Sequence, residues 1–475
     1  MIIQLDSREN PIQHYHFIGI CGVAMAQVAA WLKSVGKTVT GSDQGVYPPM
    51  STFLESRGIS ILSPFTADHI VSADIVVVGN AISRGNPELE AALERRLTCI
   101  SLPQLIQQEI LKHKLPAVVS GTHGKTTTTA ALAFMLQAGS RFGGSLVGGI
   151  PVGWDSGFQV SEGDWFAIEG DEYDTAFFDK RPKFLHYQPQ LAIINNIEFD
   201  HADIYASYEE ILKQFGYLVR IIPRNGCLIL NADQPGLAKL ADEAHCQVVT
   251  YGQSEASQVR GTDVQLTPDG MSFTLRFASG ESRVCQTALW GDHQLANLLA
   301  ASAAAEFAGV SPADIVSGMA AFKGVRRRLE LKYCDGNSWV YDDFAHHPTA
   351  IRMTLETLKK RHPGVPLIAA FEPRSNTMVR KRLEQDLINA LSLADMAALG
   401  PIHRSAKIPA EDRLSLEHIL ISLRDKDISA FQSDDAHELC ARMLESAPSG
   451  AVYIVMSSGS FLGLVDYLVN CIENK

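Results

Sequence analysis

Val118-Val119-Ser120-Gly121-Thr122-His123-Gly124-Lys125-Thr126-Thr127-Thr128 places a short apolar run before a glycine-rich turn, and helix-compatible residues follow. This order predicts a strand, a phosphate-binding loop and a helix whose N-terminus faces the phosphates. Gly121 and Gly124 let backbone N–H groups approach phosphate oxygens closely. We expect Lys125 to reach the terminal phosphates of a nucleotide and the Thr126 hydroxyl to bind Mg²⁺. The alternative is an ordinary strand-to-helix turn that contains a lysine.

The length and composition are those of a multidomain globular protein. The 475 residues are too many for one hydrophobic core, so about two to four domains are expected. The net charge of −12 argues against a nucleic-acid binder, whose surface is basic. The eight cysteines include no Cys-x-x-Cys pair, which argues against a zinc ribbon. Without a long apolar run or a secretory core, we expect a cytoplasmic protein with no membrane partner and no obligate protein partner.

The first part of the chain suggests a nucleotide-binding βαβ unit. A strand from Tyr15 to Gly22 runs into a glycine turn, and a second strand, Thr38 to Thr40, precedes Asp43. An acidic residue about twenty positions after the glycines is typical of ribose binding. A plain structural turn and the turn of a nicotinamide-dependent oxidoreductase are compatible with the same residues. The strand from Ile75 to Asn80 leads into another polar loop of the kind that binds ligands.

Two strands after the phosphate loop end in acidic residues. Phe166 to Glu172 is one, and Leu191 to His201 is the other. Because Mg²⁺ prefers oxygen ligands and shares them with phosphates, the carboxylates beside the loop predict a magnesium site. Glu169 is alternatively a solvated strand end, and the phosphate loop favours the metal interpretation. His201 taken alone is more typical of a hydrogen-bonded structural histidine than of a ligand.

The remaining chain predicts an antiparallel ribbon and a further βα module. Residues 257–287 alternate apolar and polar, and Gly291 to Asn297 opens an alanine-rich helix. The run Arg326-Arg327-Arg328 follows and is compatible with a solvated basic turn. The strand from Trp339 to Asp343 and the strand from Leu367 to Phe371 then alternate with helical segments, as expected for a parallel sheet.

Several ordered motifs, spread over essentially the whole chain, resemble those of the Mur ligase family of peptidoglycan metabolism. They are Gly121-Thr122-His123-Gly124-Lys125-Thr126-Thr127, Glu169-Gly170-Asp171-Glu172-Tyr173-Asp174, Asn196-Ile197-Glu198-Phe199-Asp200-His201-Ala202-Asp203, Gly291-Asp292-His293-Gln294-Leu295-Ala296-Asn297, Arg327-Arg328-Leu329-Glu330 and Asp343-Phe344-Ala345-His346-His347-Pro348. The resemblance implies an α/β fold in three domains. These are a Rossmann-like UDP-sugar-binding domain over 1–112, a central P-loop ATP-binding domain over 113–325 and a Rossmann-like acceptor-peptide-binding domain over 326–475.

The resemblance also implies roles for individual residues. It assigns ATP binding to Gly121, Thr122, His123, Gly124, Lys125, Thr126, Thr127, Asn297, Arg328, Asp343 and His346. It assigns Mg²⁺ binding to Thr126, Glu169 and His201, and catalysis to Lys125, His201 and Arg328. UDP-sugar binding falls on Gly19, Cys21, Gly22, Asp43, Asn80 and Arg84, and acceptor binding on Arg374, Ser375 and Asn376.

Two positions depart from the family pattern. Gln294 stands where the family usually has Asn, which puts one adenosine contact in doubt although Asn297 is retained. Some members carry a carbamylated lysine about fifteen residues after the motif histidine. Here that region is Phe215-Gly216, and Lys213 lies roughly one helical turn short of the required place.

The family chemistry is ATP-dependent formation of an amide bond. The lactyl carboxylate of UDP-N-acetylmuramate would be activated as an acyl phosphate and attacked by the amine of an amino acid or peptide. Within the family, Val46 to Ser51, Ala176 to Arg181, His186-Tyr187 and Glu372 to Met378 resemble the branch whose acceptor is L-alanyl-γ-D-glutamyl-meso-diaminopimelate, recovered from the cell wall. The branch that adds L-alanine is the alternative, and a non-catalytic ATP-driven binding module is an alternative of a different class.

Overall fold

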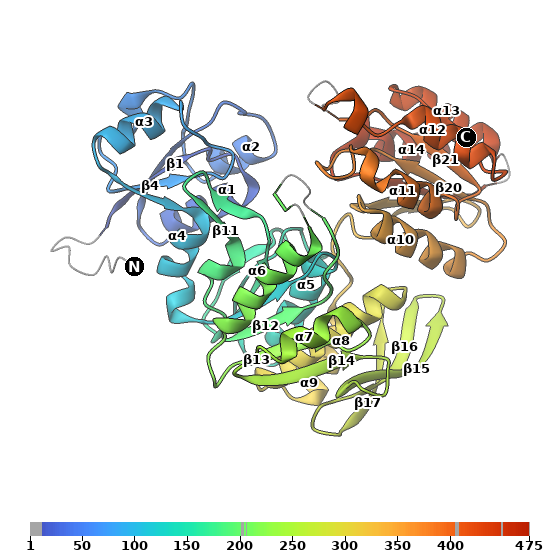
Figure 1. The fold of residues 1–475 in the computed structure, drawn as a ribbon, viewed down its shortest axis with the longest axis horizontal. Helices are drawn as coiled ribbons and strands as arrows, with labels where there is room; N and C mark the ends of the chain where they lie inside the picture. Colours follow the sequence, from blue (N-terminus) through green and yellow to red (C-terminus); the bar gives the residue numbers. More distant parts are fainter. Residues whose placement is uncertain (1–11, 201–203, 206, 404–407, 448–449, 475) are drawn as a thin grey trace.

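The computed structural model describes residues 12–200, 204–205, 207–403, 408–447 and 450–474. Three main sheets, each accompanied by helices, follow one another along the chain, so the expected α/β class is confirmed. In Figure 1 the N-terminal part, in blue, and the C-terminal part, in orange to red, lie on opposite sides above the central part. In the described part of the chain, no helix has both the length and the apolar character needed to cross a membrane.

The N-terminal sheet is parallel throughout, with the strand order β3-β2-β1-β4-β5. Its elements are β1 (His14–Ile18), α1 (Val23–Ser34), β2 (Thr38–Ser42), α2 (Met50–Ser56), β3 (Ile61–Leu62), η1 (Ala67–Ile70), β4 (Ile75–Val78), α3 (Pro87–Glu94), β5 (Thr98–Ser101), α4 (Leu102–Glu109) and η2 (Leu111–His113). The strand order reverses at β1 and β4, and open α/β sheets bind ligands in the crevice beyond such a point.

The central sheet has ten strands in the order β17-β16-β15-β14-β13-β12-β6-β9-β7-β8. Its strands are β6 (Leu115–Ser120), β7 (Phe142–Leu146), β8 (Phe158–Val160), β9 (Trp165–Gly170), β12 (Leu191–Ile194), β13 (Cys227–Asn231), β14 (Gln247–Gly252), β15 (Val259–Thr267), β16 (Gly270–Arg276) and β17 (Ser282–Thr287). The last three form the expected antiparallel ribbon. A separate ribbon pairs β10 (Asp174–Ala176) with β11 (Asp179–Pro182).

Helices cover both faces of the central sheet. They are α5 (Lys125–Ala138), η3 (Lys183–His186), α6 (Tyr208–Arg220), η4 (Pro235–Leu237), α7 (Ala238–Ala241), α8 (Asp292–Phe307) and α9 (Pro312–Ala321). Strand β6 is buried on both faces because its side chains alternate: Ala117 and Val119 join the core with α5, α8 and α9, whereas Val118 joins the core with α6.

The strands on either side of β6 end level with it. Ser120, the last residue of β6, pairs with Gly170 of β9 and with Ile194 of β12. All three strands are parallel, so the chain segments that follow them emerge at the same edge of the sheet. This register brings the glycine-rich turn, the first acidic segment and the segment after Ile194 together.

The C-terminal sheet has six strands in the order β18-β19-β23-β20-β21-β22, and only β18 runs antiparallel to its neighbour. Its elements are β18 (Glu330–Cys334), β19 (Trp339–Asp343), α10 (Pro348–Arg361), β20 (Leu367–Phe371), η5 (Lys381–Leu383), α11 (Glu384–Leu391), β21 (Met396–Leu399), η7 (Ala410–Asp412), α12 (Leu416–Arg424), β22 (Ser429–Gln432), α13 (Ala436–Ser446), β23 (Val452–Met456), η8 (Phe461–Gly463) and α14 (Leu464–Glu473). Met456 pairs with both Asp343 and Phe371, so these strand ends also share one edge.

The hydrophobic cores are distributed unequally among the three parts. Tyr15 and Phe17 of the N-terminal sheet belong to the same continuous core as Val118 and Phe166 of the central sheet. The C-terminal sheet instead has separate cores on its two faces. The C-terminal part is therefore the one that can shift relative to its neighbours without opening a shared core.

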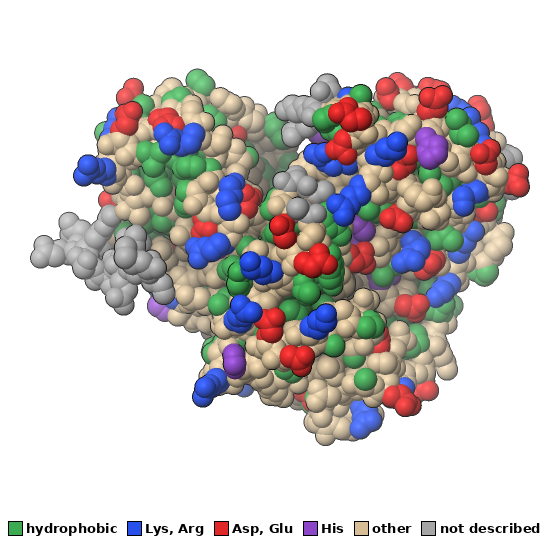
Figure 2. Space-filling view, in the orientation of Figure 1, with side chains coloured by type: hydrophobic (Ala, Val, Ile, Leu, Met, Phe, Trp, Pro, Cys, Tyr) green, Lys and Arg blue, Asp and Glu red, His purple; other side chains and the backbone are tan. Residues whose placement is uncertain are grey.

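The surface carries charges of both signs. Figure 2 shows Lys and Arg side chains interspersed with Asp and Glu over the viewed face, without a single large basic area. The net charge of the whole chain is −12.

Candidate active site

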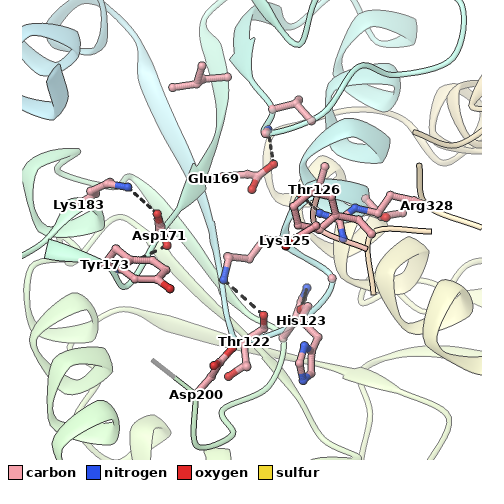
Figure 3. Close-up of a pocket in the computed structure, with 18 of the residues that line it drawn as sticks. Thr122, His123, Lys125, Thr126, Glu169, Asp171, Tyr173, Lys183, Asp200 and Arg328 are labelled. Carbon is pink, nitrogen blue, oxygen red and sulfur yellow. Dashed lines mark hydrogen bonds and ion pairs between the residues drawn. The ribbon is translucent and has the colours of Figure 1, made fainter. Parts of the chain in front are cut away.

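A cavity of about 1170 Å³ lies where the three parts of the chain meet. The residues expected from the sequence that line it are Gly19, Gly22, Asp43, Asn80, Thr122, His123, Gly124, Lys125, Thr126, Thr127, Glu169, Asn297, Arg328, Asp343, His346 and Ser375. The fold thus gathers residues more than three hundred positions apart around one space, and Figure 3 shows the part of its wall formed by the phosphate loop.

The phosphate loop has the backbone geometry that its glycines predict. Gly121 and Gly124 have φ angles of +129° and +81°, which L side chains rarely adopt. The loop is held by the segment after β12: Thr122 N donates to Asn196 O at 3.0 Å, and His123 N donates to Asn196 Oδ1 at 2.8 Å. Helix α5 begins at Lys125, directly after the loop, so its N-terminus faces the cavity.

Lys125 is held by a buried carboxylate that the sequence did not identify as a site residue. Its Nζ donates to Gly121 O at 2.7 Å and to Glu172 Oε2 at 2.9 Å. Burial alone would lower the Lys125 pKa, but the charges of Glu172 and Asp171 raise it, so the lysine is charged. Glu172 lies inside a motif that was recognised. Strand β9 pairs with β6, and this pairing places the Glu172 carboxylate beside Lys125.

Glu169, Thr126 and Arg328 meet on one side of the loop. Arg328 Nη2 donates to Thr126 Oγ1 at 3.1 Å, and the Glu169 carboxylate accepts from Gly148 N and from the Thr126 hydroxyl. Burial raises the Glu169 pKa, and the nearby Arg328 and Lys125 oppose that rise. A hydroxyl and a carboxylate side by side are suitable oxygen ligands for Mg²⁺, so these two residues fit the expected ion.

The third expected Mg²⁺ ligand, His201, lies outside the described residues. Its neighbour Asp200 is described, is buried and lines the cavity. Three further polar residues of the wall, Asp171, Tyr173 and Lys183, were not identified from the sequence. Lys183 Nζ lies 2.6 Å from Asp171 Oδ2, and Figure 3 shows this pair facing the loop from the opposite side of the cavity.

Asn297 lies directly beneath the phosphate loop. Its Oδ1 accepts from Thr128 Oγ1 at 3.2 Å, and its Nδ2 donates to Gln294 Oε1 at 3.2 Å. Gln294, the departure from the family pattern, therefore orients Asn297. Beyond it, the cavity continues past His293 of the same motif and past residues that the sequence gave no reason to select, namely Asn231, Asp233, Gln234, Tyr251 and Gln253.

The C-terminal part contributes a charged cluster around Arg328. Asp343 accepts from Leu329 N and Ala345 N, each at 2.6 Å, which fixes the backbone beside Arg328. The Arg328 guanidinium lies 4.7 Å from the Phe344 ring centroid. Burial raises the pKa of Asp343 to about 6 and lowers the pKa of His346 to about 4, so His346 is neutral at pH 7.

Some of the residues expected to bind the UDP-sugar lie at the cavity, and others do not. Asp43 accepts from Cys21 N and Gly45 N, both at 2.9 Å, so it stabilises the glycine turn whose members Gly19 and Gly22 line the cavity. Cys21 contributes this backbone contact. Arg84 is not brought into the cavity, because its guanidinium pairs with Glu90 at 2.9 Å and its side chain is 68% exposed. The expectation that Arg84 lies in the site is not met in this arrangement.

Of the residues expected to bind the acceptor, only some line the cavity. Ser375 lines the cavity, whereas Asn376 is exposed and lies outside its lining. Arg374 Nη1 donates to Glu372 Oε1 at 3.2 Å, and its guanidinium packs so closely over Gly459 that a Cβ there would lie 2.5 Å from Arg374 Cζ. Glu372 is buried, so it fixes the orientation of Arg374, which like Asn376 is not among the residues that line the cavity.

Three models of the Mur ligase family match consecutive parts of the chain. They are the "Mur ligase family, catalytic domain" at residues 14–114, the "Mur ligase middle domain" at 119–305 and the "Mur ligase, glutamate ligase domain" at 327–459. The UDP-N-acetylmuramate–L-alanyl-γ-D-glutamyl-meso-2,6-diaminoheptandioate ligase of Escherichia coli K12 is 37% identical over 97% of this chain and 98% of its own. The UDP-N-acetylmuramate–L-alanine ligase of Variovorax paradoxus is 30% identical over 95% of this chain and 93% of its own.

Solved structures match over a similar extent. The crystal structure of a murein peptide ligase from Psychrobacter arcticus is 33% identical, covers 98% of this chain and 99% of its own, and superposes with a TM-score of 0.73. The UDP-N-acetylmuramate-alanine ligase of Thermotoga maritima has a TM-score of 0.78 at 23% identity and covers 98% of this chain and 100% of its own. At that identity it supports the fold alone.

Substituting Gly124 tests the geometry of the phosphate loop. In Gly124→Ala the new Cβ would lie 2.3 Å from Asn297 Oδ1 at a φ of +81°, so we expect a several-fold higher KM for ATP and a loss of about 1–3 kcal/mol in unfolding free energy. Steady-state kinetics and urea denaturation measure the two effects. Gly153→Ala is the control, because Gly153 has a φ of +89° but no atom within 4 Å of the new Cβ. An equal ATP KM in both variants would contradict the assignment.

Neutralising Glu172 tests its competition with nucleotide for Lys125. If Lys125 binds the nucleotide phosphates as predicted, ATP competes with the Glu172 carboxylate for the ammonium. Because Glu172→Gln removes that ion pair, the free variant should unfold at a lower temperature than the wild type. In the variant, the phosphates of ATP would supply the negative charge beside Lys125 that Glu172 no longer provides. We therefore expect ATP to raise the melting temperature more in the variant than in the wild type. Differential scanning fluorimetry with and without MgATP measures both. A smaller ATP-induced increase in the variant would show that Glu172 supports nucleotide binding instead.

Proposed function

The chain belongs to the Mur ligase family, and we propose that it is the ATP-dependent ligase that joins UDP-N-acetylmuramate to L-alanyl-γ-D-glutamyl-meso-diaminopimelate. The observation that carries this proposal is the 37% identity, over 97% of this chain, with a relative named for that reaction. The relatives named for L-alanine addition are 29–31% identical over comparable lengths. The recovered tripeptide would thus be returned to a cell-wall precursor in one step.

We assign the nucleotide to the phosphate loop and the start of α5. Backbone N–H groups at Gly121–Gly124 and the Lys125 ammonium would hold the phosphates of ATP. Thr126 and Glu169 would hold Mg²⁺, which supplies charge compensation for the phosphates. Arg328 already donates to Thr126, so it would reach a terminal phosphate from the C-terminal side with little movement.

The reaction would proceed in two steps that these residues support. A carboxylate oxygen of the lactyl group attacks the γ-phosphorus, ADP leaves, and the acyl phosphate forms. The peptide amine then attacks the acyl carbon, and inorganic phosphate leaves with that carboxylate oxygen. Lys125 and Arg328 stabilise the negative charge on the transferring group, and loop amides complete its surroundings. Asp343 acts as a positioning residue because it fixes the backbone beside Arg328.

We assign the donor to the N-terminal part and the acceptor to the C-terminal part. Gly19, Gly22, Asp43 and Asn80 lie at the strand ends where open α/β sheets bind nucleotides, and would hold the UDP group. The tripeptide carries three free carboxylates, whereas L-alanine carries one. An arginine matches a carboxylate with two parallel hydrogen bonds, and Arg374 is oriented for this by Glu372.

Removing the Lys125 ammonium should abolish ligation. Lys125→Ala loses the charge that faces the phosphates, and we expect turnover to fall by at least about 10²-fold while the far-ultraviolet circular dichroism is retained. Release of ADP that depends on both the UDP-sugar and the tripeptide is the assay. Lys239→Ala, an exposed lysine on α7, is the matched control and should behave as the wild type. Near-normal turnover in Lys125→Ala would refute the phosphate-loop assignment.

Acceptor preference tests the specificity. With ATP, Mg²⁺ and UDP-N-acetylmuramate, the tripeptide should react far faster than free L-alanine, because it offers more carboxylates to bind. Arg374→Ala should raise the KM for the tripeptide by about tenfold and leave the KM for ATP nearly unchanged. Lys381→Ala, on an exposed turn nearby, provides the control. Preference for L-alanine would contradict the assignment of the tripeptide as acceptor. ADP release without any acceptor would favour a nucleotide-driven binding module.

A further inference from the structure

A group of three potential metal ligands lies beside the phosphate loop. Among the residues that the structure describes, His123, Glu198 and His347 are the group of histidine, cysteine and acidic side chains whose ligand atoms all lie within 4.8 Å of one another. None of the three belongs to the Mg²⁺ set expected from the sequence. They come from the loop, the segment after β12 and the start of α10, so they span the boundary between the central and C-terminal parts.

The distances within this group suit a bound ion better than direct hydrogen bonds. His123 Nε2 lies 3.4 Å from Glu198 Oε2, and His347 Nδ1 lies 3.7 Å from the same oxygen. Charge-assisted hydrogen bonds are shorter, at about 2.7–2.9 Å. Ligands of a tetrahedral ion with bonds of about 2.0–2.1 Å lie about 3.3 Å apart, close to the separations seen here. The two imidazole rings are tilted by 46°, with centroids 5.0 Å apart.

An ion would bind to lone pairs of the two imidazoles and of the carboxylate, so the contacts that these atoms now make matter. Burial lowers the pKa of His347 to about 4, so the ring is neutral at pH 7. Its Nδ1 accepts from Thr349 N at 3.3 Å, so an ion bound to Nδ1 would replace this long hydrogen bond at the start of α10. His123 Nε2 and Glu198 Oε2 are within hydrogen-bond reach at 3.4 Å, and an ion between them would replace that contact.

We propose that His123, Glu198 and His347 form a binding site for a divalent transition metal of the Zn²⁺ class, which ties the phosphate loop to helix α10. Two imidazoles and one carboxylate favour such an ion over Mg²⁺, which prefers oxygen ligands. Glu198 already joins the two parts, because its Oε2 accepts from Thr349 Oγ1 at 2.7 Å. His123 and His347 both line the cavity, so water from the cavity would complete the ligands of a bound ion.

Such an ion would restrain a movement that the fold otherwise permits. The C-terminal part has its own cores and meets the loop through polar contacts, including Arg328 to Thr126 and Thr349 to Glu198. A metal bridge from His347 to His123 would hold these parts in one arrangement and fix the loop that binds phosphates.

Cobalt binding to the full-length chain, with no nucleotide or substrate, tests the site. Co²⁺ with four nitrogen and oxygen ligands has strong visible absorption, so its titration in excess Mg²⁺ should show one ion per chain that Zn²⁺ displaces. His347→Asn keeps a side chain that caps α10 but lacks the imidazole. This variant and His123→Asn should each weaken Co²⁺ binding at least about tenfold. His437→Asn, on the exposed start of α13, and Glu169→Gln should bind as the wild type does.

The outcomes are decisive in both directions. A loss of affinity in His123→Asn and in His347→Asn, with normal circular dichroism and unaltered binding in the two controls, supports a site that bridges the two parts. Unchanged affinity in either histidine variant, a loss in Glu169→Gln, or no visible absorption in the wild type would overturn it. Because the probe is the metal alone, the result does not depend on the ligase assignment.

Discussion

The structure depends on how the segment after β12 holds the phosphate loop. Two loop amides, of Thr122 and His123, donate to Asn196, and Glu198 N donates back to Thr122 Oγ1 at 2.9 Å. Each such bond contributes about 0.5–1.5 kcal/mol, which offsets part of the conformational entropy lost by a glycine-rich turn. The bonds exist because β6, β9 and β12 are parallel and end level, so the rest of the site is positioned relative to this edge.

Local features of the site could be read from the sequence, whereas long-range pairing could not. The strand, loop and helix around Lys125 follow one another along the chain, and Asp43 follows its own strand, so spacing alone located them. Glu172 and Glu198 lie in motifs that were recognised, but their partners are fixed by strand order and by contact with α10. Spacing also could not show that Glu90, one turn into α3, pairs with the Arg84 guanidinium at the surface, outside the cavity lining.

The C-terminal part completes the site while keeping separate cores. Arg328 reaches the start of α5, and Arg382 lies 3.7 Å from the ring centroid of Phe199, so this part contacts the central sheet mainly through charged and polar groups. Such contacts can be remade after a shift, unlike a packed apolar core. Closure of this part would exclude water from the cavity, which protects an acyl phosphate from hydrolysis.

In the proposed reaction, one cavity activates a carboxylate with ATP and then transfers the acyl group to an amine. Isotope transfer measures this: UDP-N-acetylmuramate labelled with oxygen-18 in its lactyl carboxylate is ligated to the tripeptide, and the released phosphate is analysed by mass spectrometry. We expect each phosphate released to carry one oxygen from the labelled carboxylate. Unlabelled phosphate accompanying stoichiometric amide formation would contradict it.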